Sequence, residues 1–204
     1  MKMILPAVAG LFCMAAVVAC SDKKEESASG CQPYTVDSLL NNADALVGDT
    51  VCVEGVVNHL CSHGATKAFL VGADSALLRC QATAEMGGAF PLDCKGTELC
   101  VYGVVREQRT DSAAVEAMEA RYAAADSAAQ AHEGCDTEKK AAGQDSCSTF
   151  AARMEDYRAR IAERCAKEGK NYLSTYYVEA LKCAPAGECC TKACDKACDK
   201  ECTK

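Results

Sequence analysis

Residues 48–57 read GDTVCVEGVV, and residues 96–105 read GTELCVYGVV. Both segments begin with glycine, continue with an apolar residue followed by Cys-Val, and end in Gly-Val-Val. Apolar runs rich in β-branched residues are typical of β-strands, and a glycine within a strand allows sharp coiling or a bulge. We therefore interpret the repeat as two strands of one barrel rather than as two copies of a binding motif.

Three further segments have the composition of strands. The first strand continues to about Cys61, and two apolar segments follow after short turns, KAFLVG at 67–72 and ALLRCQA at 76–82. Residues 172–183, YLSTYYVEALKC, alternate and are rich in β-forming side chains. Before the first strand, residues 34–45 place apolar side chains at helical spacing, which predicts a short helix.

The pattern of strands and glycines over residues 47–106 resembles an OB-fold. It looks like the OB-like domain of a family of bacterial envelope lipoproteins. The resemblance implies a small closed barrel, but it does not indicate a ligand, because this fold carries many unrelated functions.

An OB barrel needs a fifth strand, but residues 111–168 are helical in pattern. Apolar side chains recur at helical spacing in 111–132 and again in 146–167, with a polar link between them, which predicts a helical hairpin. Cys135 and Cys147 lie at its turn, where a disulfide would staple it. We predict an α+β domain over residues 34–183, a five-stranded OB-like β-barrel with this hairpin inserted before the last strand, 172–183.

The N-terminus has the features of a lipoprotein signal. Residues 1–19 combine a basic start with a short apolar run and small residues before Cys20, which resembles a lipobox. Cys20 is therefore the expected lipidation site, and residues 20–33 form a polar tether. Serine after Cys20 favours the outer membrane, at its periplasmic face or at the cell surface. The alternatives are an uncleaved anchor or an ordinary signal peptide.

Charge and missing motifs exclude several classes of function. The net charge is −7 and the folded region has no basic block, so nucleic acid is not an expected partner. The sequence contains no glycine-rich phosphate loop, no serine nucleophile elbow and no C-x-x-C pair, and we expect no enzyme activity.

The first strand ends in a motif with metal-binding character, His59-x-Cys61-x-His63. Alternation along a strand would place all three side chains on one face, where they would form a three-ligand site with an open position. The alternative is a disulfide at Cys61 between two surface histidines.

The tail, residues 184–204, is of low complexity and is expected to be disordered on its own. Clustered thiolates suit soft metals, with zinc or copper as the expected ions. The proposed donors repeat mostly every four residues: Cys189, Cys190, Cys194, Cys198 and Cys202. The alternatives are a disulfide-bonded tail and a flexible tail of free thiols, and an odd number of cysteines remains once Cys13 and Cys20 are set aside.

The sequence thus predicts a non-enzymatic, membrane-anchored envelope lipoprotein that binds soft metal ions through Cys and His. One alternative is a structural or interaction module that binds an envelope protein or a glycan, with the cysteines as disulfides. Another is a thiol redox protein.

Overall fold

The computed structural model of the chain describes residues 32–187, apart from 74, 128–129 and 131–134. The predicted signal peptide, Cys20, most of the tether and the cysteines of the tail lie outside these residues. The described elements in chain order are β1 (Tyr34–Thr35), α1 (Val36–Asn42), β2 (Thr50–Leu60), β3 (Lys67–Val71), β4 (Leu77–Ala82), η1 (Ala84–Met86), η2 (Leu92–Cys94), β5 (Glu98–Asp111), α2 (Ser112–Ala124), α4 (Asp136–Ala141), α5 (Phe150–Glu168) and β6 (Tyr172–Pro185).

Five strands close into a barrel in the order β2-β3-β4-β6-β5, with β5 returning to pair with β2. All neighbours are antiparallel except β4 and β6, which are parallel. This is the topology of an OB-fold, and it confirms the predicted five-stranded barrel with a helical insertion before its last strand.

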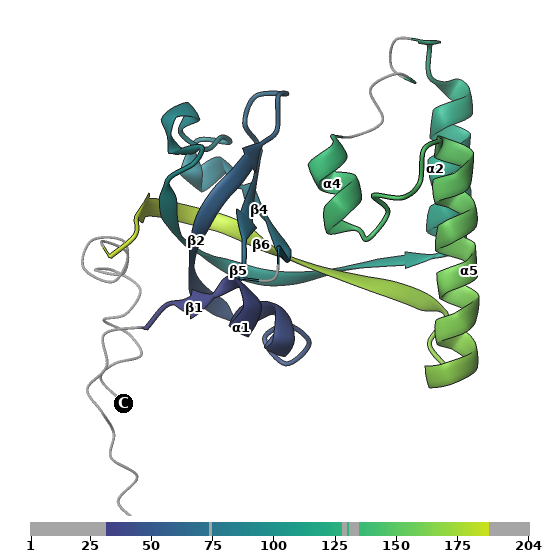
Figure 1. Ribbon diagram of the computed structural model, residues 1–204, viewed down its shortest axis with the longest axis horizontal. Helices are drawn as coiled ribbons and strands as arrows, with labels where there is room; N and C mark the ends of the chain where they lie inside the picture. The colour runs from purple at the N-terminus through teal and green to yellow at the C-terminus, as the bar shows by residue number, and fades with distance from the viewer. Residues whose placement is uncertain (1–31, 74, 128–129, 131–134, 188–204) are drawn as a thin grey trace, which may run out of the picture.

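The N-terminal segment differs in detail from its prediction as a single helix. Tyr34 and Thr35 pair with β2 as a short parallel strand, and α1 begins only afterwards. The Thr35 hydroxyl caps the helix by accepting a hydrogen bond from the backbone N–H of Ser38. Val36 and Leu39 are fully buried, and α1 lies beside the barrel with these side chains in its core (Figure 1).

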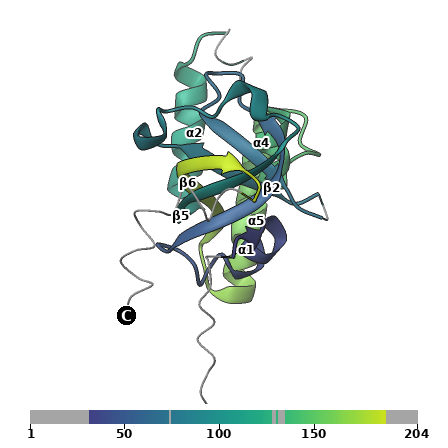
Figure 2. The same ribbon diagram turned by 90° about the vertical axis from the view of Figure 1, so that its left-hand side faces the viewer.

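Strand β5 ends six residues beyond the predicted segment, at Asp111 instead of Val105, and this extension changes the shape of the molecule. Its last residues, Arg106 to Asp111, pair with β6 between Tyr177 and Tyr172, outside the closed part of the barrel. The two strands therefore leave the barrel as a ribbon that ends at α2 and α5, and these helices stand away from the barrel (Figure 1). In a view from the barrel side, both helices lie behind the barrel (Figure 2).

Helices α2 and α5 form a separate small core at the tip of this ribbon. Its buried members are Val115, Met154 and Ile161, with partly buried neighbours from both helices and from the start of β6. The predicted apolar stripes therefore pack against each other, except that Cys165 at the end of the second stripe is exposed. Among the described residues no helix is long and apolar enough to cross a membrane.

The polar link of the hairpin is not a simple turn, because it contains the short helix α4. This helix lies between the barrel and the α2–α5 pair (Figure 1). Gln144, fully buried, fixes the segment that follows: its amide nitrogen donates to the Arg153 carbonyl oxygen and to Asp156 Oδ2 at 3.0 and 2.9 Å. The disulfide predicted between Cys135 and Cys147 is absent, and both residues are free thiols.

The repeated glycines have the structural role inferred from the sequence. The register between β5 and β6 shifts between Tyr102 and Gly103, which marks a bulge. A Cβ at Gly103 would overlap the Glu179 carbonyl oxygen, and one at Gly55 would lie 2.8 Å from Val36 Cγ2. Glycine at each position therefore allows another element to approach the strand closely.

Replacing Gly103 with alanine should destabilise the barrel. The methyl group would force β5 and β6 apart, and overpacking of this kind costs about 1–3 kcal/mol. Urea unfolding followed by circular dichroism measures the loss. Glu98→Ala, at an exposed position of the same strand, should change the free energy of unfolding by less than about 0.5 kcal/mol. Equal stability of the two variants would contradict this role of Gly103.

Candidate functional site

A cleft of about 1040 Å³ lies between the barrel and the helical insertion. One wall comes from β3, β4 and the β5–β6 ribbon, and the other from α2, α4, α5 and the segment between α4 and α5. In OB-folds the second and third barrel strands and the loop between the fourth and fifth strands make the usual ligand-binding face. Here these elements are β3, β4 and the insertion, so the cleft occupies that face.

Arg79 on β4 is the most strongly fixed cation in the cleft. Its guanidinium carbon lies 4.4 Å from the centre of the Tyr177 ring, and its Nη2 donates to Gln108 Oε1 at 2.8 Å. Only 14% of its side chain is exposed, and its Nε is buried without a hydrogen-bond partner in the structure. An unsatisfied buried donor is costly, so Arg79 has capacity to bind a further acceptor.

Glu138 on α4 connects the insertion to the barrel. Its Oε1 accepts a hydrogen bond from Lys67 Nζ at 2.6 Å and lies 3.8 Å from Arg79 Nη1. The second distance is an ion pair but too long for a hydrogen bond. Because the Lys67 and Glu138 side chains are each nearly a third exposed, this contact contributes on the order of 1 kcal/mol.

Aromatic side chains supply the apolar part of the cleft. Phe69 is fully buried at its floor, and Tyr176 lies on the ribbon. On the insertion, the rings of Tyr122 and Phe150 stack with their centres 4.1 Å apart. The cleft therefore offers ring faces beside charged groups, a combination that suits a ligand with an apolar body and polar substituents.

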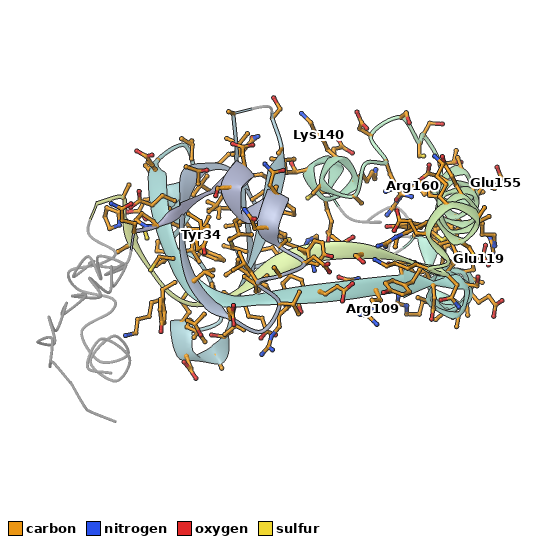
Figure 3. The ribbon with its side chains drawn as sticks, turned by 90° about the horizontal axis from the view of Figure 1, so that it is seen from below. Tyr34, Arg109, Glu119, Lys140, Glu155 and Arg160 are labelled. Carbon is orange, nitrogen blue, oxygen red and sulfur yellow. The ribbon has the colours of Figure 1, made fainter. Side chains whose placement is uncertain are left out.

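The outer wall is held in place by hydrogen bonds to the segment after α4. Arg160 Nη1 donates to the Ala142 carbonyl oxygen at 2.9 Å and lies 3.2 Å from Asp156 Oδ2. Arg160 lies on the side of α5 that faces α4, whereas Glu155 lies on its outer side (Figure 3). Together with buried Gln144, these contacts fix one wall of the cleft before any ligand enters.

The predicted metal ligands in the fold lie away from this cleft. His59 is on β2 next to a register shift between Val57 and His59, so strict alternation is interrupted there. Its Nε2 is buried without a partner, and its ring centre lies 5.9 Å from that of Phe69. Cys61 and His63 follow β2 in the turn, where His63 is exposed. Within the described part of the chain, no three His, Cys, Asp or Glu side chains are grouped so that they could hold a metal ion.

Three cysteines of the barrel belong to its core or its edge. Cys80 and Cys94 are buried in the main core, and Cys183 packs against it. Burial raises the pKa of the Cys80, Cys94 and Cys183 thiols and is the largest cause at each of them. At Cys80 and Cys94, the nearby Cys183 raises the pKa further. At neutral pH these thiols stay protonated, which makes them poor nucleophiles and poor metal ligands.

Sequence reasoning missed the residues that shape the cleft. Arg79 gave a usable signal, because it is a charged residue in the apolar run 76–82. Glu138 gave none, since it is one of several charged residues in a polar link. Only the packing of α4 against the barrel distinguishes it from its neighbours.

No protein-family model matches this sequence, and no curated protein is significantly similar to it.

The tail cysteines remain the predicted soft-metal donors. We expect metal bound by the anaerobically purified mature chain to be lost when the chain is ended at Ala186, because the clustered thiols are removed. Elemental analysis with thiol counting measures this. As a matched test of the strand motif, the full-length His59→Ala/His63→Ala variant should keep its metal. Metal retained by the shortened chain and lost from that variant would assign the site to His59, Cys61 and His63 instead.

Proposed function

We propose that this protein is a non-enzymatic envelope lipoprotein, anchored at the outer membrane through Cys20, that binds a ligand in the cleft between its barrel and its helical insertion. The observation that carries the proposal is the position of the insertion. It stands over the usual ligand-binding face of an OB barrel and leaves a cleft of about 1040 Å³ rather than closing on it.

The composition of the cleft supports binding rather than catalysis. The described residues that line it include neither His nor Cys. The cleft instead contains Arg and Lys side chains, tyrosines and an apolar floor. These groups are suited to hold and orient a ligand. The alternative of an interaction module remains within this proposal, since an envelope protein or a glycan could present the bound group.

Soft-metal binding by the tail is the second candidate function. It is favoured by the spacing of Cys190, Cys194, Cys198 and Cys202, which would line one side of a helix if the tail became helical on binding. Cleft and tail are separate parts of the chain, and each function is tested independently of the other. The third reading, a thiol redox protein, has less support, because the pKa values of Cys80, Cys94 and Cys183 are raised.

The anchoring is tested at Cys20. In a Gram-negative host, labelled palmitate should be incorporated into the wild-type chain and not into Cys20→Ala, because the thiol is the acylated group. Fractionation should place the wild type with outer membranes. Cys13→Ala, within the predicted signal peptide, is the matched control and should be labelled normally. Equal labelling of Cys20→Ala and the wild type would contradict the assignment.

Ligand binding is tested by filling the cleft. Ala141 on α4 lines the cleft, whereas Ala120 on α2 is exposed and does not. A panel of sugars, amino acids, short peptides and organic acids should contain compounds that raise the melting temperature of the wild type and of Ala120→Trp. They should have no effect on Ala141→Trp, whose indole occupies the space.

The panel also separates binding from catalysis. A bound compound should be recovered chemically unchanged after prolonged incubation with the protein. If a compound still raises the melting temperature of Ala141→Trp, its binding site lies outside the cleft. If the compound is chemically converted, the protein is an enzyme.

A further inference from the structure

We propose that the ligand of the cleft carries an acidic group, and that Glu138 occupies the position of this group while the cleft is empty. This inference rests on the proposed function and adds two things to it: the chemical class of the ligand, and an internal competitor on α4.

The charge of the cleft is opposite to that of the protein. The net charge of the chain is −7. Among the described residues that line the cleft, the carboxylates are Glu138 and Asp145 only, and the cations are Arg79, Arg121, Lys139, Lys140, Arg153 and Arg160. Side chains of one charge around a cleft concentrate ligands of the opposite charge there. This cleft therefore attracts anions, although the protein as a whole is acidic.

Two of these cations, Arg121 and Lys140, form no ion pair with a carboxylate of the described residues, whereas Lys139 lies 3.2 Å from Asp136 Oδ1. Arg121 is exposed, and the hydrogen bond found for it runs from its Nε to the Ala117 carbonyl oxygen of its own helix. Lys140 is exposed at the end of α4 (Figure 3). Arg160, by contrast, lies 3.2 Å from Asp156 Oδ2 and contributes mainly to the wall.

Arg79 provides a fixed point for an acidic group. Stacking on Tyr177 and the hydrogen bond to Gln108 hold its guanidinium in one orientation. Its Nε is buried without a partner. A planar guanidinium of this kind binds a carboxylate or a phosphate through two parallel N–H donors, and little conformational freedom is lost because the group is already ordered.

Glu138 already places a carboxylate at this position, although incompletely. It bonds Lys67 at 2.6 Å, but its oxygen stays 3.8 Å from Arg79 Nη1 and leaves Arg79 Nε unsatisfied. An acidic group free of the helix could approach Arg79 more closely than α4 permits. The ligand would then replace Glu138 at Arg79, and the weak contact that joins α4 to the barrel would respond to ligand binding.

The body of the ligand is expected to be apolar or aromatic. The cationic side chains are interspersed with the partly exposed rings of Tyr122, Phe150 and Tyr176. Stacking and cation–π contacts with these rings would add to the ionic contact. Carboxylate and phosphate share the chemistry that Arg79 recognises, and competition by benzoate and by phenyl phosphate distinguishes them.

The experiment uses two fluorescent probes that differ by one sulfonate group, anionic 1-anilinonaphthalene-8-sulfonate and neutral N-phenyl-1-naphthylamine. Each is titrated into the mature chain, residues 20–204 with Cys20→Ser, kept reduced. We expect the anionic probe to bind about tenfold more tightly, which corresponds to roughly 1.4 kcal/mol. Ala141→Trp should abolish binding of both probes.

Two charge-matched double variants locate the effect. Arg121→Gln/Lys140→Gln should weaken binding of the anionic probe about fivefold to tenfold and leave the neutral probe unchanged, as expected for lost ionic contacts. Lys95→Gln/Lys170→Gln removes the same charge at exposed positions outside the cleft and should change neither. If the two double variants weaken binding of the anionic probe equally, the effect comes from the net charge of the protein and not from the cleft, which would overturn the inference.

Glu138→Gln tests the internal competitor. Removing the carboxylate should tighten binding of the anionic probe about threefold to tenfold, because Arg79 and Lys67 become available, with no change for the neutral probe. Unchanged or weaker anion binding would show that Glu138 is only a structural contact. If both probes bind equally and Ala141→Trp abolishes both, the ligand class is wrong while the cleft remains a binding site. If neither probe responds to Ala141→Trp, the proposed function fails as well.

Discussion

The rest of the structure depends on the antiparallel pairing of β5 with β6. Between Leu99 and Val105 this pairing closes the barrel, and from Arg106 to Asp111 it continues beyond the barrel as a ribbon. The bulge at Gly103 lies within the first part, and the close approach of Glu179 there is possible because residue 103 lacks a Cβ. A long hydrogen-bonded ribbon holds its outer end at a defined distance, which a flexible loop of the same length would not do.

The ribbon explains why an insertion of nearly sixty residues leaves the barrel face accessible. Helices α2 and α5 complete their own core with Val115, Met154 and Ile161, so they do not need the barrel to bury their apolar stripes. In the described part of the insertion, α4 forms ion pairs with the barrel through one carboxylate shared by Lys67 and Arg79. The cleft is the space that this arrangement leaves, and the Glu138 carboxylate bridges it to Lys67 and Arg79.

The sequence predicted elements whose signal is local. The Gly-Val-Val repeat identified the two central strands, and the step of four and three residues identified α5. It did not predict α4, because the residues of this six-residue helix have no apolar periodicity and read as a polar link. It also ended β5 too early, since Arg106, Gln108 and Arg109 are exposed polar residues that only their pairing with β6 identifies as strand.

The sequence by itself determined the barrel and the place of the insertion, because periodicity and strand glycines act over short stretches of chain. It also predicts the chemistry of the two ends, from the residues around Cys20 and the cysteines of the tail. Only the tertiary structure decided where the cleft lies and which side chains line it. Arg79 and Glu138 lie 59 positions apart in the sequence, and no local pattern relates them. They meet because barrel closure fixes β4 and the ribbon fixes the insertion, so the cleft and its charge follow from long-range pairing.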